Sequence, residues 1–382
     1  MDVYVTGVGM VRVSRHFNLG LRDLAAQAAF QALEKSGAGS VDAVVAASTL
    51  SYRQAGQLDL AGHIAGALGL RGAITMAVEA GEASGLAAVA AGCSLIRSHQ
   101  ASRVLVVGVD KLSDYVSARV YRDLQRLYEA EVQALYDIGH AGVAGLLARL
   151  YMKRYGVDRE TLSYWPAMDH AHAKENPYAM LRFAVDPKSV ATAMTVADPL
   201  TLLDAFPLGD GAAALVLESG DSRGRGLAAV KLATSAAGYP ALTMAPDPLK
   251  LEPVAMLASR LSEVAGVRPS EVDVVELGDS FTINGLLLAE ALGLAEPGRA
   301  AARARDGAFT VGGDGPVVNA SGGLKARGHP VGATGVYMVG EIALQLAGEF
   351  PGLQVEGARR GLAVAASGDG SSAHMVYLEG VM

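Results

Sequence analysis

An internal repeat is the feature that most constrains the fold. The segment Gly-Asp-Gly-Ala-Ala-Ala at 209–214 recurs as Gly-Asp-Gly-Ser-Ser-Ala at 368–373, and an apolar stretch follows each copy. The offset, 368 − 209 = 159 residues, is close to half of the 382-residue chain. A second pair recurs in the same order, because Val-Asp-Ala-Val-Val at 41–45 is echoed by Val-Asp-Val-Val-Glu at 272–276. Two ordered echoes predict a duplicated structural unit rather than a chance similarity of turns.

Short apolar stretches alternate with longer helical patterns in both halves. Strands separated by helices of this length predict crossover connections and an α/β fold with a largely parallel or mixed sheet. The expected strands lie at 2–6, 43–47, 103–109 and 213–217, and then at 228–234, 272–277, 362–366 and 375–378. The expected helices lie at 21–36, 57–68, 84–98, 253–264, 282–292 and 334–347.

One stretch, at 111–200, does not fit the repeat. It is rich in tyrosine and histidine and holds the single tryptophan, Trp165. A helical insertion of this kind either covers a site, forms a subunit contact, or builds a small core of its own. We therefore predict an N-terminal half at 1–222, containing a helical loop domain at about 111–200, and a C-terminal half at 223–382.

Charge and hydropathy exclude several function classes. The net charge of −7 and the pI near 5.6 argue against nucleic acid or an anionic membrane as a partner. No run approaches the ~18 uncharged apolar residues of a membrane span. The chain enters a strand at once, without a signal-peptide pattern, so we expect a cytoplasmic protein. The single cysteine, Cys93, excludes an internal disulfide and a cysteine-rich metal site.

Four separated regions carry the candidate chemistry. The most specific is Asn-Ala-Ser-Gly-Gly-Leu-Lys-Ala-Arg-Gly-His-Pro-Val-Gly-Ala-Thr-Gly at 319–335. The others are Val-Glu-Ala-Gly-Glu-Ala-Ser-Gly-Leu at 78–86, Glu-Leu-Gly-Asp-Ser-Phe at 276–281, and a series at 139–142, 151–156 and 176–179. The 78–86 segment opens a helix, and the unpaired N–H groups of a helix N-terminus favour an anion or a developing oxyanion.

Together these regions resemble the thiolase superfamily, and in particular its archaeal and sterol-carrier-type members. The resemblance covers essentially the whole chain. It implies a five-layer αβαβα fold built from two similar halves with a helical loop domain. It also implies acyl-CoA thioesters as substrate or ligand without a separate cofactor or metal, a role in lipid metabolism, and a homodimer or homotetramer. Thiolases of this branch often work with a small zinc-ribbon/OB-fold partner protein, which is therefore a possible partner here.

The same resemblance assigns site residues. Catalytic positions fall on Glu82 (the nucleophile position), His329, Gly278 (an oxyanion position) and Gly368, and substrate-binding positions fall on Ser84, Asp279, Asn319, Lys325 and His140. The backbone N–H groups of residue 82 and Gly368 are expected to serve as oxyanion donors, and Lys325 and Arg327 are expected near the CoA phosphates. The simpler interpretation of Lys325 and Arg327 is that both are solvated basic side chains.

The chain departs from the family pattern where the chemistry is most demanding. The family's acyl-accepting cysteine is here Glu82, a weak nucleophile whose acyl anhydride would hydrolyse readily. Gly278 stands where the family has a His or Asn, and Ala365 or Ala366 stands where a Cys or Asn is common. Cys93 cannot substitute, because it lies 93 − 82 = 11 residues along the helix, or ~16 Å.

Three functions follow from this pattern. The first is altered C–C chemistry, either retro-aldol cleavage or enolate protonation, with Glu82 as a base or as an electrostatic group and with Tyr239 or Asp279 as an additional acid. The second is a catalytically inactive homologue that acts as a CoA-binding or scaffolding subunit. The third is an acetyl-CoA acetyltransferase of unusual mechanism.

Two further patterns are weaker. Gly7-Val8-Gly9 after the first expected strand suggests a dinucleotide-binding oxidoreductase, but it lacks a third glycine in register. His170 and His172 are two residues apart and converge poorly on a helix, so a metal site there is not expected.

Overall fold

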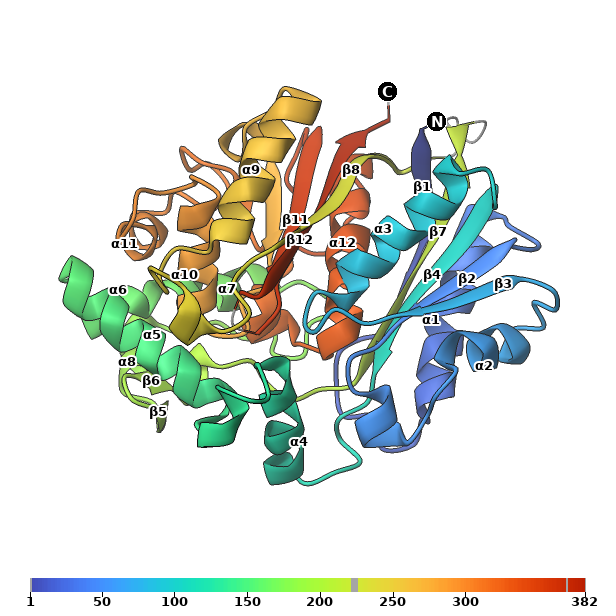
Figure 1. Ribbon diagram of the computed structural model, residues 1–382. Helices are drawn as coiled ribbons and strands as arrows, with labels where there is room; N and C mark the ends of the chain where they lie inside the picture. Colours follow the sequence, from blue (N-terminus) through green and yellow to red (C-terminus); the bar gives the residue numbers. More distant parts are fainter. Residues whose placement is uncertain (1, 221–225, 369, 382) are drawn as a thin grey trace.

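The computed structural model describes residues 2–220, 226–368 and 370–381. Within these residues, ten strands form one mixed sheet in the order β10-β9-β11-β12-β8-β1-β7-β4-β2-β3, and β5 and β6 form a separate hairpin (Figure 1). The strands are β1 (Val3–Met10), β2 (Ala43–Ala47), β3 (Ile74–Val78), β4 (Arg103–Asp110), β5 (Thr195–Ala197), β6 (Leu200–Thr201), β7 (Gly211–Ser219), β8 (Ala228–Ala237), β9 (Val274–Leu277), β10 (Val317–Val318), β11 (Arg360–Ala366) and β12 (Ser372–Gly380).

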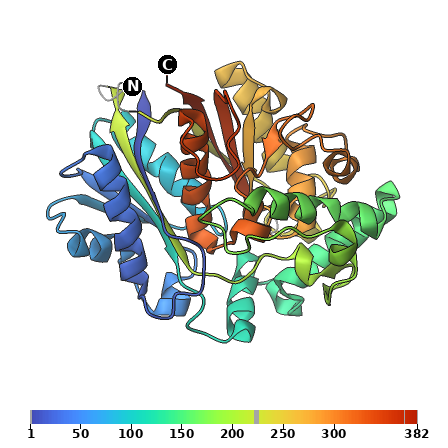
Figure 2. The same ribbon diagram turned by 180° about the vertical axis from the view of Figure 1, so that it is seen from behind.

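The helices cover the sheet in three layers (Figures 1 and 2). They are α1 (Leu21–Ser36), α2 (Leu60–Ala67), α3 (Ser84–Arg97), α4 (Ser117–Leu124), α5 (Gly139–Tyr155), α6 (Arg159–Leu162), α7 (Tyr164–Ala173), α8 (Pro187–Ala191), α9 (Glu252–Ala265), α10 (Thr282–Ala291), α11 (Ala300–Arg305) and α12 (Thr334–Ala347). The pair α1 and α2 packs on the first half of the sheet, and α9 and α10 pack on the second. Between them, α3 and α12 contact strands of both halves, which completes a five-layer αβαβα arrangement.

The strand order confirms the duplication that the repeat predicts. The first half runs β3-β2-β4-β7-β1 and the second runs β10-β9-β11-β12-β8, so the two halves have equivalent strands in the same relative positions. The halves join where β1 pairs antiparallel with β8, with Val3 opposite Val230. The predicted boundary between residues 222 and 223 lies in 221–225, outside the described residues.

Gly7 and Gly9 lie inside β1 rather than in a loop between strand and helix. A Cβ on Gly7 would lie 2.1 Å from the carbonyl oxygen of Ala32, and one on Gly9 would lie 2.0 Å from that of Ala28. These glycines therefore let α1 approach the strand closely. The dinucleotide-binding interpretation of this pair is wrong, because it requires the glycines to form the turn that opens a helix.

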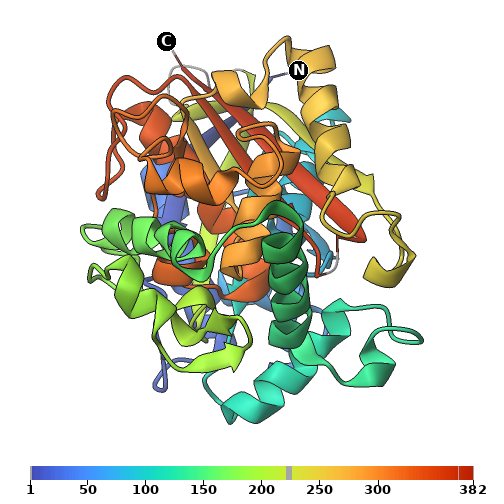
Figure 3. The ribbon, with the colours of Figure 1, turned by 90° about the vertical axis from the view of Figure 1, so that its left-hand side faces the viewer.

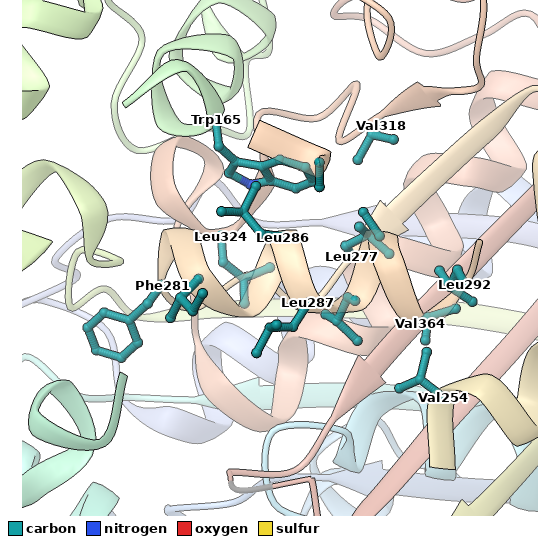
Figure 4. Packing of buried hydrophobic residues seen from close by; sticks show 14 of the residues in the cluster. Trp165, Val254, Leu277, Phe281, Leu286, Leu287, Leu292, Val318, Leu324 and Val364 are labelled. Carbon is teal, nitrogen blue, oxygen red and sulfur yellow. The ribbon is translucent and has the colours of Figure 1, made fainter. Parts of the chain in front are cut away.

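The segment between β4 and β7 holds the helices α4 to α8 and packs beside the second half (Figure 3). Its aromatic residues do not form a separate core. Trp165 is fully buried against Leu286 of α10, in the same cluster as Leu277 of β9 (Figure 4). A Cβ on Gly285 of α10 would lie 2.5 Å from the Trp165 ring, so the indole fills a groove that only glycine leaves open. No helix in the described ranges is long and apolar enough to cross a membrane.

Candidate active site

Glu82 lies in the turn between β3 and α3. Gly81 takes the left-handed conformation there (φ +59°), which favours glycine. The buried Ser84 hydroxyl donates to the carbonyl oxygen of Gly81 at 2.6 Å and accepts from the N–H of Ala80 at 2.8 Å. Ser84 therefore stabilises the turn through hydrogen bonds to its backbone, and its hydroxyl is occupied by these protein contacts.

Two glycines bring the turn to the second half of the chain. A Cβ on Gly85 of α3 would lie 2.6 Å from the backbone nitrogen of Val336, and one on Gly335 of α12 would lie 2.4 Å from that of Leu86. The first turns of α3 and α12 are thus in backbone contact. Since His329 precedes α12 as Glu82 precedes α3, the contact places the two site residues together.

The carboxylate of Glu82 faces two imidazoles. Its Oε1 lies 3.1 Å from Nε2 of His329 and 3.6 Å from Nε2 of His140. Glu82 is 6% exposed, and both histidines are buried. In the described part of the chain, Oε2 of Glu82 has no hydrogen-bond partner. The structure therefore brings together Glu82, His329 and His140, which are three of the predicted site residues.

Each imidazole is held through its other nitrogen. Nδ1 of His329 lies 2.7 Å from the Thr334 hydroxyl, and Nδ1 of His140 lies 2.6 Å from the Tyr128 hydroxyl. When the Thr334 hydroxyl donates to Nδ1 of a neutral His329, that ring carries its proton on Nε2 and points it at Glu82. The site is then a carboxylate that accepts from the His329 N–H, while Nε2 of His140 lies 3.6 Å away and has no hydrogen-bond partner among the described residues.

Burial and hydrogen bonding act against each other at Glu82. Burial raises the pKa of its carboxyl, but His140 and His329 lower it by more, so the pKa lies well below its ordinary value. Burial lowers the pKa of His329, and the nearby Glu82 offsets this only in part. An ionised Glu82 beside a neutral His329 agrees with both directions.

Aromatic rings enclose this group. Phe206 meets His329 edge-on, with ring centroids 4.8 Å apart and planes at 90°. Phe281 lies against His140 with centroids 4.9 Å apart. Sequence reasoning missed Tyr128 and Phe206, which lie outside the motifs, and gave no role to Thr334, although it lies within the 319–335 motif.

Asp110, at the end of β4, was also not identified from the sequence. Its carboxylate accepts from the N–H of Gly332 at 2.7 Å, of Leu50 at 3.0 Å and of Thr49 at 3.1 Å, and from the Ser48 hydroxyl at 2.5 Å. Burial raises the pKa of this carboxyl to about 6, although these donors oppose the shift. Asp110 joins the His329 turn to the first half of the sheet.

The predicted oxyanion positions are closely packed. A Cβ on Gly278 would lie 2.9 Å from that of Ala365, so these two departures from the family pattern are neighbours. A Cβ on Gly368 would lie 2.4 Å from the carbonyl oxygen of Leu127.

A cavity of about 390 Å³ adjoins the Gly81 turn and is lined by Thr49, Leu50, Arg53, Glu79, Ala80, Gly81, Asp123, Arg126, Leu127, Ser367 and Ser372.

Asn319 and Asp279 belong to a fully buried polar network. The Asn319 amide donates to Asp279 at 2.8 Å and to Asp169 at 3.1 Å, and the Trp165 N–H also donates to Asp279 at 2.9 Å. Burial raises the pKa of Asp169, and the adjacent Asp279 raises it further. A buried pair of carboxyls held this way orders the loop before His329, and its role as a substrate contact stays a prediction.

The remaining candidates lie in varied surroundings. Lys325 is buried and donates to the carbonyl oxygens of Ala205 and Leu202, and Arg327 is buried beside Glu341. Neither presents a free cation at the surface, so a contact with CoA phosphates stays a prediction.

His170 and His172 bond to backbone carbonyl oxygens, and no cluster of metal-ligating side chains occurs among the described residues. Tyr239 is at the surface, and Cys93 is buried.

Family models match nearly the whole chain. The thiolase N-terminal domain matches residues 3–221, and the thiolase C-terminal domain-like model matches residues 234–379. An acetyl-CoA acetyltransferase from Methanothermobacter thermautotrophicus is 33% identical over 97% of this chain and 98% of that protein. Sterol carrier protein 2 from Homo sapiens is 30% identical over 94% of this chain and 68% of that protein.

Solved structures share the fold. The structure described as an Ltp2-ChsH2(DUF35) aldolase superimposes with a TM-score of 0.84 at 21% identity, over 99% of this chain and 98% of that chain. Human mitochondrial 3-ketoacyl-CoA thiolase in complex with CoA superimposes with a TM-score of 0.77 at 17% identity, over 100% and 98%. The duplicated five-layer fold, the paired helix N-termini at its centre and both family models agree: the chain belongs to the thiolase family.

Proposed function

We propose that this protein binds acyl-CoA thioesters at Glu82 and cleaves a carbon–carbon bond in them by retro-aldol chemistry, without forming an acyl-enzyme. One observation carries the proposal: a buried carboxylate, expected to be ionised, faces the Nε2 atoms of His329 and His140 at the centre of a thiolase fold. Such a group can accept a proton once the His329 N–H turns to the substrate, and it is poorly suited to accept an acyl group.

The alternative nucleophile is unsuitable. Burial raises the pKa of the Cys93 thiol to about 12, so the thiolate is not populated near neutral pH. Gly278 has no side chain with which to donate to an oxyanion. Acetyl transfer through a covalent intermediate therefore lacks both its nucleophile and one donor.

In the proposed reaction, a 3-hydroxyacyl-CoA places its hydroxyl at the Glu82 carboxylate. Glu82 takes the hydroxyl proton, the bond between C2 and C3 breaks, C3 becomes a carbonyl, and the bonding pair passes into the thioester as an enolate. Glu82 then returns the proton to C2, which leaves an acyl-CoA and an aldehyde or ketone. Enolate protonation is thus the second half of the same reaction.

The histidines couple substrate binding to basicity. When the thioester oxygen takes the N–H of His329, Glu82 loses a donor that lowered its pKa. The carboxylate becomes a stronger base as the substrate arrives, which is the condition that proton abstraction needs.

Assembly is part of the proposal. We propose a homodimer or homotetramer, and a small DUF35-type partner of the zinc-ribbon/OB kind. Support for the partner comes from the name of the similar solved structure, an Ltp2-ChsH2(DUF35) aldolase, which pairs two protein names and an aldolase activity. Cytoplasmic location and a role in lipid metabolism stay predictions.

The test is release of an aldehyde or ketone from a 3-hydroxyacyl-CoA. We expect wild type to release it, Glu82→Gln to be slower by ~100-fold or more, and the surface control Glu263→Gln to match wild type. Tight CoA binding without turnover, also in the presence of a DUF35-type protein, would support the scaffolding function. Thiolysis of acetoacetyl-CoA that Glu82→Gln abolishes would support an acetyl-CoA acetyltransferase of unusual mechanism.

A further inference from the structure

Lys325 has unusual surroundings for a lysine. Its side chain is 4% exposed, four residues before His329 in the chain. The ammonium donates to the carbonyl oxygen of Ala205 at 2.8 Å and to that of Leu202 at 3.3 Å. No ion pair joins Lys325 to a carboxylate of the described residues, and the hydrogen bonds of its ammonium go to these two backbone oxygens.

The carbonyl groups that it holds belong to the segment that carries Phe206. The N–H of Phe206 donates to the carbonyl oxygen of Ser280 at 3.0 Å, and Ala205 forms a bridge with Phe281. The Phe206 ring is buried and meets His329 edge-on at 4.8 Å between centroids. It also approaches His140, at 5.9 Å.

These contacts close a loop through the site. The chain leads from Lys325 to His329, the His329 imidazole touches the Phe206 ring, and the backbone before Phe206 returns to the Lys325 ammonium. A methionine would fill the same space, but it would leave two carbonyl oxygens without this donor. Burial of a cation is unfavourable, so its presence here calls for a role beyond filling space.

We propose that Lys325 is a positioning residue, which holds Phe206 against the His329 imidazole and so fixes the direction in which Nε2 of His329 points. The inference rests on the proposed function only in taking Glu82 and His329 as the reacting pair. Lys325 itself touches neither of them.

The charges around Lys325 agree with this role. Burial lowers its pKa to about 8, and Asp204 and Asp169 oppose the shift. Asp204 is itself engaged by Thr282 at 2.8 Å and by the N–H of Thr201 at 2.7 Å. At neutral pH the side chain therefore keeps its three donors for the two carbonyl groups.

The experiment follows the imidazole resonances of His329 by NMR, assigned with His329→Asn. We compare Lys325→Met with the matched surface control Lys174→Met, and with Phe206→Leu. The proposal predicts that Lys325→Met and Phe206→Leu move the His329 resonance in the same way, that the double variant adds no further shift, and that Lys174→Met leaves it unchanged. An unmoved resonance in a folded Lys325→Met protein overturns it, as do additive shifts in the double variant.

Should Lys325→Met fail to fold, Lys325→Gln keeps a donor and takes its place, with a His329 resonance expected between those of wild type and Phe206→Leu. A resonance identical to wild type in that variant overturns the proposal. The NMR readout needs no substrate, so it can fail while the retro-aldol reaction stands, or succeed where no reaction is found. Where activity is measurable, we expect kcat of Lys325→Met to fall ~10- to 100-fold with KM little changed.

Discussion

At the scale of single residues, the site depends on which group occupies position 82. An ionised glutamate there needs a donor, and the structure supplies Nε2 of His329 at 3.1 Å, with Nε2 of His140 nearby at 3.6 Å. The same imidazoles would be free to serve another partner if the residue were uncharged and apolar. The charge of Glu82 therefore organises the site before any substrate binds.

Acid should weaken this arrangement in a specific way. Because the folded pKa of Glu82 lies below its ordinary value of 4.5, the carboxylate contributes stability that is complete above pH 4.5 and is lost as the pH falls through the folded value. We expect wild type to lose stability relative to Glu82→Gln as the pH is lowered from about 5 to about 2. Urea unfolding of both proteins at several pH values measures the difference, and a difference independent of pH contradicts the assignment.

Sequence reasoning recovered the motif residues at this scale but not their supports. Glu82 and His329 lie within motifs, as does Thr334, but nothing in the sequence distinguishes the Thr334 hydroxyl from a helix cap, and Tyr128 and Asp110 lie outside the motifs. Their roles depend on contacts between residues far apart in the chain, such as that between Asp110 and Gly332. Residue types alone do not predict such contacts.

At the scale of elements, the contact between α3 and α12 decides whether the site exists. Gly85 and Gly335 let the two helices touch through their backbones. A methyl group at either position must push the helices apart, and with them Glu82 and His329.

We therefore expect Gly335→Ala to lower the free energy of unfolding by ~1–3 kcal/mol and to weaken catalysis as well. Gly66→Ala in α2 is the matched control, since a Cβ there meets nothing within 4 Å. The control should be neutral or stabilising by up to ~1 kcal/mol. Equal effects of the two substitutions on urea unfolding would show that the helix contact does not constrain the fold.

Periodicity predicted several elements closely and missed others. The helices 21–36 and 334–347 agree with α1 and α12 at both ends, because each carries a regular apolar pattern. The strand β3 was not expected, since it has only five residues and these are largely exposed, without an alternation of buried and exposed side chains. The expected helix at 57–68 begins only at Leu60.

At the scale of the whole molecule, the site needs both halves of the duplication. Glu82 follows the third strand of the first half, β3, and His329 follows β10, the equivalent strand of the second. The repeat in the sequence predicted the two halves. It did not predict that their equivalent helix N-termini meet at the reacting groups.

One of the two edges of the sheet supports the proposed homodimer. β3 lies at the end of the sheet, and Ile74 and Met76 are 39% and 38% exposed in a single copy. An exposed apolar edge strand is a template for pairing with another strand. We expect Met76→Lys to convert a dimer to monomers in light scattering, while Met256→Lys on α9 leaves the dimer intact. A wild-type monomer, or a dimer in both variants, would contradict pairing through β3.

We propose that position 82 receives an acyl-CoA but no longer carries its acyl group. The intact mass of wild type and Glu82→Cys after incubation with acetyl-CoA tests this. We expect unmodified wild type and an acetylated variant whose adduct disappears when His329 is replaced by Asn. An acetyl group on the wild-type protein, or none on the folded variant, would contradict it.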